Sequence, residues 1–195
     1  MVNPVEDLAA LLQRQKAARI AEGPVNAAVR RDRLQRAIDM LVRHRVALCD
    51  ALDADFGNRP RVVSLTMDVM GAITSLKYAQ KHVARWMKPR HCKGVMHLSL
   101  FGARGWVEYQ PKGVVGILGT WNFPLYTMLA PLAYVLAAGN RSLIKPSELN
   151  PRTAETLARA VQECFDPAEV AVVNGGVDVG RAFAALPFDH LVLTG

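Results

Sequence analysis

Residues 111–148, PKGVVGILGTWNFPLYTMLAPLAYVLAAGNRSLIKPSE, contain the pattern that decides the fold. The short apolar run Val114–Leu118 predicts a buried strand. Leu125–Ala138 is apolar over the length of a helix, and a Gly-Asn pair then stops it. Ser142–Lys145 predicts a second short strand. A strand, a helix and a strand in this order are typical of a parallel sheet.

Two polar residues stand at the ends of these strands. Asn122 lies in the turn after the first strand, and Lys145 ends the second. Because open α/β sheets bind ligands at the carboxyl ends of their strands, we expect a site here. From the residues alone, Asn122 has two interpretations. Its amide can donate to a developing oxyanion, or it merely ties a turn, which is the commoner role of Asn.

Lys145 and Glu148 follow the second strand. Pro146 prevents a helix from continuing directly, so we expect both side chains to project from a loop at the carboxyl edge of the sheet. From the residues alone, a surface ion pair is the simpler interpretation. The glycines before this loop are spaced by threes and do not match the dinucleotide fingerprint. Their spacing therefore gives no independent evidence for a nucleotide.

Residues 1–90 predict helices that act as scaffold. The first helix covers about Val5–Glu22 and ends at a Gly-Pro break. The second covers about Ala27–Phe56 and is capped by Gly57. A third runs from about Ser64 to Met87 and ends before a proline. Leucines at helical intervals give the second helix an apolar face. We expect its arginines to lie largely elsewhere, on a solvated face; these are Arg30, Arg33, Arg36 and Arg43.

Residues 91–110 predict a β-hairpin. Met96, Leu98 and Leu100 alternate with polar residues, a Gly-containing turn follows, and Trp106–Tyr109 is again strand-like. An exposed hairpin implies a partner subunit, although it could equally pack on its own chain.

The rest of the chain continues the alternation of strands and helices. Asn150 and Pro151 predict an N-cap and first helical residue, and the helix runs to about Cys164. Val170–Val173 predicts a strand. A short helix from about Asp178 to Leu186 and a last strand, Leu191–Leu193, follow. Four strands alternating with three helices predict an open, mostly parallel sheet, hence an α/β fold.

Composition limits the function classes. The chain has 195 residues, 51% of them hydrophobic, and a net charge of +7. Its basic excess lies in the first 112 residues, where basic residues interleave with apolar ones, so solvated helix faces are favoured over a nucleic-acid or membrane patch. The apolar segment 125–138 is shorter than the roughly 20 residues that span a bilayer. We expect no nucleic-acid, membrane or metal partner.

The cysteines favour a reducing compartment. Cys49, Cys92 and Cys164 are odd in number and widely separated, which does not fit a disulfide framework. The first twenty residues carry charges and no apolar core, so no signal peptide is predicted. We expect a cytoplasmic protein.

The central stretch resembles the cofactor domain of the NAD(P)-dependent aldehyde dehydrogenases. Gly-Thr-Trp-Asn-Phe-Pro and Ala-Ala-Gly-Asn-Arg-Ser-Leu-Ile-Lys-Pro-Ser-Glu carry the resemblance, and the Val-Asn-Gly-Gly and Phe-Asp-His-Leu-Val-Leu-Thr-Gly segments extend it over 107–195. The chain is most similar to the coniferyl-aldehyde and class 3 branch. The resemblance implies a helical segment at 1–90, an oligomerisation hairpin at 91–110 and a partial, Rossmann-like NAD(P)-binding domain at 111–195.

The resemblance also implies roles for individual residues. Asn122 would stabilise the oxyanion that forms when a cysteine thiolate adds to the aldehyde. Lys145 and Glu148 would hold the adenosine ribose, and Glu148 would repel a 2′-phosphate, which favours NAD while NADP remains possible. The further cofactor-binding residues that the resemblance implies are Thr120, Trp121, Ser147, Thr194 and Gly195.

The family's nucleophile and general base are not found in this sequence. They would be a cysteine in a Gly-Gln-x-Cys-like segment and a glutamate in a Glu-Leu-Gly-Gly-like segment. We therefore expect the N-terminal part of an enzyme that oxidises an aromatic, coniferyl-type aldehyde to its carboxylate, inactive alone and a homodimer or higher oligomer when intact. The alternative is a non-catalytic nucleotide-binding or oligomerisation module.

Overall fold

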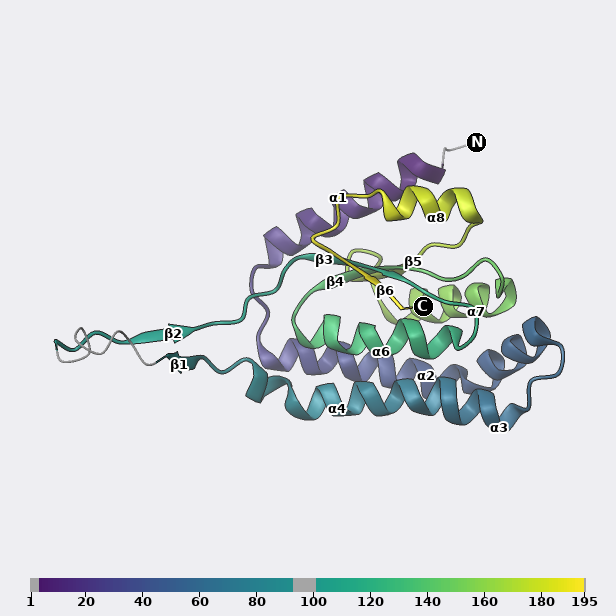
Figure 1. The fold of residues 1–195 in the computed structure, drawn as a ribbon, viewed down its shortest axis with the longest axis horizontal. Coiled ribbons are helices and arrows are strands. Elements are labelled where there is room, and N and C mark those ends of the chain that lie inside the picture. Colours follow the sequence, from purple (N-terminus) through teal and green to yellow (C-terminus); the bar gives the residue numbers. More distant parts are fainter. Residues whose placement is uncertain (1–3, 93–100, 195) are drawn as a thin grey trace.

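The computed structural model describes residues 4–92 and 101–194, and it contains helices and strands in the predicted order (Figure 1). In chain order the elements are α1 (Pro4–Glu22), α2 (Ala27–Phe56), α3 (Arg61–Val63), the π-helix η1 (Ser64–Met70), α4 (Gly71–Trp86), β1 (Arg90–Cys92), β2 (Gly105–Val107), β3 (Val114–Leu118), α6 (Pro124–Ala137), β4 (Arg141–Lys145), α7 (Pro151–Cys164), β5 (Val170–Val172), α8 (Val177–Ala184) and β6 (His190–Leu193).

The main sheet has the strand order β5-β4-β3-β6, and each neighbouring pair is parallel. This confirms the predicted α/β fold. Leu118 pairs with Lys145, so β3 and β4 end side by side at the carboxyl edge. Gly116 is required in the middle of β3, because a Cβ there would lie 2.7 Å from the Phe188 ring.

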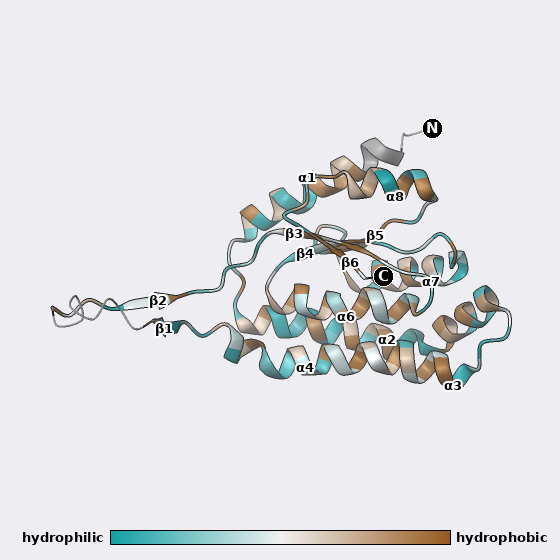
Figure 2. Cartoon of the chain, in the orientation of Figure 1, coloured by the Kyte–Doolittle hydropathy of each residue, from teal (hydrophilic) through white to brown (hydrophobic). Residues whose placement is uncertain are grey.

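Helices cover both faces of the sheet (Figure 1). α1 and α8 lie on one face, and a small core of Leu8, Leu12, Val114, Leu143 and Phe183 fills that layer. α6 and α7 lie on the other face, and α2 and α4 pack beneath them. In Figure 2 the brown, hydrophobic colour gathers on strands of the main sheet, whereas β1 of the hairpin is hydrophilic.

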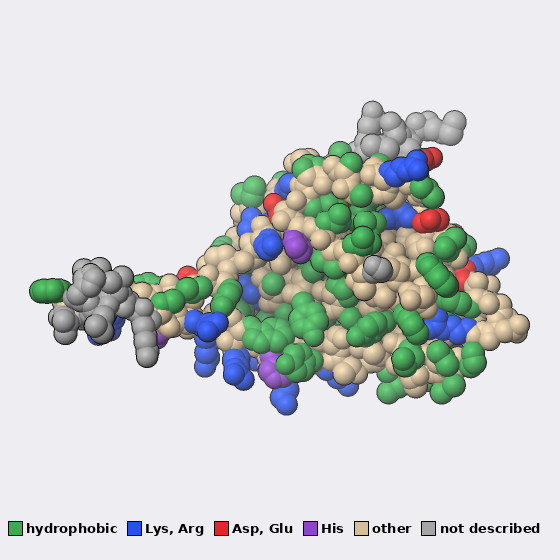
Figure 3. All heavy atoms as spheres, in the orientation of Figure 1, with side chains coloured by type: hydrophobic (Ala, Val, Ile, Leu, Met, Phe, Trp, Pro, Cys, Tyr) green, Lys and Arg blue, Asp and Glu red, His purple; other side chains and the backbone are tan. Residues whose placement is uncertain are grey.

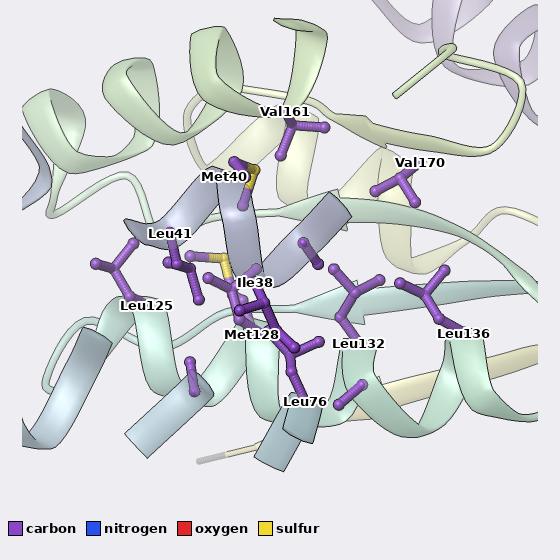
Figure 4. Packing of buried hydrophobic residues seen from close by; sticks show 14 of the residues in the cluster. Ile38, Met40, Leu41, Leu76, Leu125, Met128, Leu132, Leu136, Val161 and Val170 are labelled. Carbon is purple, nitrogen blue, oxygen red and sulfur yellow. The ribbon is translucent and has the colours of Figure 1, made fainter. Parts of the chain in front are cut away.

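The larger core joins the helices of residues 1–90 to the sheet. Figure 4 shows side chains of α2, α4, α6 and α7 converging on the face of the sheet opposite α1. These helices therefore fold against the same strands that build the candidate site. The residues labelled in this close-up are Ile38, Met40, Leu41, Leu76, Leu125, Met128, Leu132, Leu136, Val161 and Val170.

The expectation that the arginines of α2 are solvated is wrong for Arg30 and Arg33, which are buried. Arg33 donates from Nη2 to Glu22 Oε1 at 2.7 Å and from Nε to Glu169 Oε1 at 2.9 Å. Arg30 donates to the backbone carbonyls of Val25 and Ala137. Partners distant in sequence satisfy these guanidinium groups, which allows them to be buried.

The third predicted helix starts earlier and is less regular than expected. It begins at Arg61, directly after Pro60, rather than at Ser64. Its next seven residues, Ser64–Met70, form a π-helix before the α-helical hydrogen bonding resumes at Gly71. π-helical turns are rare and often accompany functional sites.

One predicted helix cap is confirmed, and the other is correct in its position but lacks a side-chain capping bond. Gly57 ends α2 with φ of 80°, and its N–H donates to Asp53 O at 2.7 Å. Asn150 precedes α7, but its side chain makes no capping bond. The carboxylate of Asp55 on α2 accepts the N–H groups of Arg152 and Thr153 instead, at 3.0 and 2.8 Å.

An antiparallel pairing is present where the hairpin was predicted: β1 pairs with β2 and His91 faces Trp106, but the second strand ends at Val107 rather than at Tyr109. The hairpin projects from the helical body in Figure 1 and exposes Phe101, Trp106 and Tyr109. The predicted alternation of Met96, Leu98 and Leu100 lies outside the described residues.

Residues 4–92 and 101–194 contain no helix that is both long and apolar enough to cross a membrane. Within the same ranges, no three or more His, Cys, Asp and Glu side chains gather as a metal site would require.

Candidate functional site

A cleft of about 680 Å³ opens at the carboxyl ends of β3 and β4. One wall is the turn Gly119–Asn122, and the second is the loop Lys145–Leu149. The third comes from α8, four residues of which line the cleft. The structure thus brings together six of the residues singled out in the sequence: Thr120, Trp121, Asn122, Lys145, Ser147 and Glu148.

The remaining two predicted cofactor residues are not among the described residues that line this cleft. Thr194 is exposed directly after β6, and Gly195 lies outside the described residues. Among the lining residues that were not predicted, four belong to α8, which the sequence did not place at this site. An amphipathic helix gives no local signal that one of its faces borders a ligand cleft. The α8 residues at the cleft are Val177, Gly180, Arg181 and Ala184.

Lys145 is buried, so the interpretation of a surface ion pair is wrong. Its side chain is 2% exposed, against 41% for Glu148, and its Nζ lies 3.6 Å from Glu148 Oε2. Nζ donates one hydrogen bond, to Pro146 O at 2.8 Å. Burial lowers the pKa of Lys145, and the Glu148 carboxylate partly opposes this change. An ammonium carries three donors, so Lys145 retains donor capacity at the wall of the cleft.

Asn122 ties its own turn through its side-chain oxygen. Oδ1 accepts from Thr120 Oγ1 at 2.9 Å and from the Phe123 N–H at 3.1 Å. Its Nδ2 has no hydrogen-bond acceptor among residues 4–92 and 101–194, and the side chain is exposed at the cleft. The Oδ1 atom of Asn122 therefore stabilises the turn, as the simpler interpretation predicted. The Nδ2–H group remains available to donate a hydrogen bond to a ligand.

The turn lies tightly against α6. The Gly119 N–H donates to Lys145 O at 2.9 Å. A Cβ on Gly119 would come within 2.6 Å of Met128, so only glycine allows the chain to pass this close to the helix.

A buried carboxylate holds the start of α6. Asp68 Oδ1 accepts the N–H groups of Leu125 and Tyr126 at 3.0 and 3.2 Å. Arg59 Nη2 donates to Asp68 Oδ2 at 2.5 Å. Burial raises the pKa of Asp68, although the Tyr126 N–H and the Arg59 charge oppose this change. Arg59 and Asp68 were missed in the sequence because neither belongs to a local motif.

Two other hollows border the molecule's surface. One of about 480 Å³ adjoins the cleft and shares Ser147 and Glu148 with it. Another of about 690 Å³ lies at the base of the hairpin and contains none of the predicted site residues. Exposed hydrophobic side chains also gather over α4 and α6 in Figure 3. Among the partly exposed aromatic residues of these two helices are Tyr78, Trp86 and Tyr134.

The groups at the cleft suit a ligand with hydroxyl and anionic groups. The cleft offers a desolvated ammonium, a carboxylate, the hydroxyls of Thr120 and Ser147, and a free amide N–H. A ribose diol joined to phosphate presents the complementary donors and acceptors. No cysteine lines the cleft: Cys49 is buried on α2, Cys92 is on β1 and Cys164 ends α7.

Known proteins resemble the chain over nearly its whole length. The sequence model of the aldehyde dehydrogenase family matches residues 5–195. Coniferyl aldehyde dehydrogenase of Pseudomonas sp. is 48% identical over 191 residues, which cover 97% of this chain and 39% of that protein. The probable coniferyl aldehyde dehydrogenase of Caulobacter vibrioides is 50% identical, over 95% of this chain and 38% of that protein. The chain thus spans about two fifths of the length of these relatives.

Solved structures share the fold. The substrate-bound state of Staphylococcus aureus AldH matches with a TM-score of 0.89 and 26% identity, over 97% of this chain and 40% of that chain. The NAD+ complex of an aldehyde dehydrogenase from Bacillus cereus matches with a TM-score of 0.78 and 23% identity, over 93% and 36%.

Proposed function

The chain belongs to the aldehyde dehydrogenase family, and from this premise we propose that its cleft binds the adenosine part of NAD(P)+. The reaction we propose for the protein is oxidation of an aromatic, coniferyl-type aldehyde to its carboxylate. Support for this substrate class comes from the similarity to two coniferyl aldehyde dehydrogenases at 48% and 50% identity. When bound, the cofactor would supply the acceptor for the hydride.

The cofactor proposal rests on the burial of Lys145 and on its single hydrogen bond. A desolvated ammonium with unused donors is costly unless a ligand uses them, and Glu148 beside it can accept from a hydroxyl. We assign the two ribose hydroxyls to Lys145 and Glu148. Ser147, Thr120 and Trp121 are assigned to the cofactor because they line the same cleft. Thr194 and Gly195 are assigned to it only by family resemblance.

Glu148 favours NAD over NADP in this proposal. A carboxylate at the ribose accepts from the 2′-hydroxyl but repels a 2′-phosphate by its charge. At 41% exposure its repulsion is weakened by solvent, so NADP is a second cofactor rather than an excluded one.

Asn122 is the oxyanion donor in this proposal. Its Nδ2 is free at the cleft while Oδ1 is held by Thr120 and Phe123, which fixes the orientation of the amide. A cysteine thiolate would attack the aldehyde, and a glutamate would activate the water that releases the acid. Because no cysteine of this chain lines the cleft, we propose that these 195 residues alone do not oxidise aldehydes.

The hairpin carries the proposal of a homodimer or higher oligomer in the intact protein. It exposes Phe101, Trp106 and Tyr109 away from the helical body, and exposed aromatic side chains are enriched at interfaces. Three free thiols fit a reducing compartment, which is why we propose a cytoplasmic location.

Binding of the cofactor to the purified chain tests the proposal. We expect calorimetry to detect saturable NAD+ binding and weaker NADP+ binding, and Glu148→Gln to reduce that difference. Glu155→Gln is the matched control, because Glu155 borders the adjoining hollow on α7 but not the cleft. Absence of saturable binding to either nucleotide, or an equal effect of the two substitutions, would contradict the assignment.

A non-catalytic nucleotide-binding or oligomerisation module is the second candidate. The observation that favours it is the lack of a cysteine at the cleft. Reading the source DNA past codon 195 in all frames separates the two candidates. A downstream nucleophile and base motif would support the enzyme, and their absence would support the module.

A further inference from the structure

Arg59 and Asp68 form a buried ion pair directly behind the cleft. Their side chains are 8% and 0% exposed, and Nη2 lies 2.5 Å from Oδ2. The guanidinium carbon of Arg59 lies over two aromatic rings, at 4.7 Å from the centroid of Phe56 and 5.0 Å from that of Phe123. These two cation–π contacts restrict the movement of the group.

The pair holds the Asn122 turn from both sides. Arg59 Nη1 donates to the backbone oxygen of Asn122 at 2.9 Å. On the other side of the turn, Asp68 accepts the N–H groups of Leu125 and Tyr126. Arg59 and Asp68 thus bond to each other. In addition, Arg59 bonds to the backbone of Asn122, and Asp68 bonds to the backbone that follows the turn.

Stability alone is a poor reason for this arrangement. Replacing a buried ion pair with well-packed apolar residues is often neutral or stabilising. Arg59 Nε is moreover buried without a hydrogen-bond partner among the described residues, which is a further cost. Unlike apolar packing, the pair makes directional hydrogen bonds, because a planar guanidinium donates along fixed lines.

We infer that Arg59 and Asp68 are positioning residues that hold Asn122 so that its Nδ2–H points into the cleft. This inference rests on the proposed role of Asn122 as oxyanion donor. Such donors must be held to within about 0.5 Å of the productive position, by neighbours whose own conformations are fixed. Asp68 lies in η1, so the π-helical turn presents this carboxylate to the start of α6.

Hydrogen exchange at single amides of the 195-residue chain tests the inference. The Phe123 N–H donates to Asn122 Oδ1 and reports on the held turn, whereas the Gly119 N–H donates to Lys145 O and reports on the adjacent sheet. Arg59→Lys keeps the charge but loses the planar fork. We expect it to speed exchange at Phe123 about tenfold, the effect of losing one hydrogen bond to a charged donor, with little change at Gly119.

The matched control is Arg61→Lys. Arg61 lies two residues away in a surface ion pair with Asp50, in which both side chains are 58% exposed. We expect no change at Phe123 in this variant. Unchanged exchange at Phe123 in Arg59→Lys, or equal acceleration at Phe123 and Gly119, would overturn the inference, because the second result means that the substitution only loosens the whole fold.

Kinetics separate this inference from the proposed function. The chain is joined to the remaining three fifths of the Pseudomonas sp. coniferyl aldehyde dehydrogenase and assayed with coniferyl aldehyde. We expect Asn122→Ala to lower kcat by about 10²–10³-fold and Arg59→Lys by about tenfold, with KM for NAD+ within about twofold in both. An unchanged kcat in Asn122→Ala refutes the proposed role of Asn122. A reduced kcat in that variant with an unchanged kcat in Arg59→Lys refutes the positioning inference alone.

Discussion

The two ends of β4 carry two buried cations with opposite surroundings. Arg141 begins the strand, and its guanidinium donates to Glu22 Oε2 at 2.6 Å and to the carbonyls of Ala18 and Ala168. Lys145 ends the strand, and its ammonium makes one hydrogen bond, to the carbonyl of the next residue. The two cations thus lie four positions apart on one strand; the two terminal nitrogens of Arg141 reach three acceptors, although its Nε is buried without a partner among the described residues, whereas Lys145 reaches one.

The difference shows which end of the sheet is structural. At the amino end, Glu22 and Glu169 each accept from two arginines, so this polar network is closed on itself. At the carboxyl end, Lys145 and Asn122 both border a cleft with donor capacity left over. A closed network stabilises the fold, and an open one can bind a ligand.

The largest effect is expected at the amino end. Arg33→Met leaves Glu22 and Glu169 without their shared partner, and loss of one member of a buried pair costs about 3–5 kcal/mol of unfolding free energy. Urea unfolding measures it. Arg14→Met is the control, because its pair with Asp166 is more than half exposed and should contribute about 0–1 kcal/mol. Similar losses in both variants would mean that the amino end is not a closed network.

At the carboxyl end, the main effect should be on binding. Lys145→Met removes the charged hydrogen bonds that we propose to the cofactor, which would be worth about 1.5–3 kcal/mol, so NAD+ affinity should fall by about tenfold to a hundredfold. The unfolding free energy should stay level or rise, because a desolvated charge is lost. Arg181→Met, in the same cleft but exposed, should change affinity less. A large loss of stability in Lys145→Met would make this lysine structural.

The capping of α7 by Asp55 is a structural interaction at the carboxyl end of the sheet. Asp55→Ala frees the N–H groups of Arg152 and Thr153 and should cost about 1 kcal/mol, as other N-caps do. Thermal unfolding and amide exchange at these two residues measure the effect. Asp53→Ala, on the same helix but exposed, should stay within about 0.5 kcal/mol. Equal losses would show that the cap contributes nothing specific.

The smallest expected effect is an opposite pH dependence at the two ends. Burial opposes ionisation of Glu169, but Arg36 and Arg33 together hold its pKa below 4.5, so its contribution to stability is lost as the pH falls through that lowered pKa. The pKa of Asp68 is raised above 3.8 by burial, so its contribution is full below 3.8 and is lost as the pH rises through the raised pKa.

Urea unfolding at a series of pH values checks these signs. On acidification, the stability difference between the wild type and Glu169→Gln should shrink. The difference between the wild type and Asp68→Asn should grow. Parallel changes in the two differences would contradict the assigned directions.

The fold of residues 111–194 could be predicted because its signals are local. Each strand is a short apolar run next to a turn, and each helix has its own stop. The same rule explains why Asn122 and Lys145 could be placed at one edge, since both directly follow a predicted strand. The position of the cleft thus follows from two strand ends.

The polar interactions behind the cleft could not be predicted. Arg33 bonds to a residue 136 positions away, and Asp68 holds the start of a helix 57 positions away. Residue spacing within one helix cannot indicate such partners, so the arginines of α2 were expected to be solvated. The cap by Asp55 was missed for the same reason, because Asn150 offered a local alternative.

The two internal caps also determine the electrostatic potential of the cleft. A helix carries about half a positive charge at its N-terminus, and at α6 and α7 that charge faces the carboxylates of Asp68 and Asp55. The protein therefore neutralises both dipoles itself, and the positive side chains left to attract an anionic ligand to the cleft are exposed Arg181 and buried Lys145. Because buried charges are screened far less than exposed ones, the attraction by Lys145 should persist at ionic strengths that suppress the attraction by Arg181.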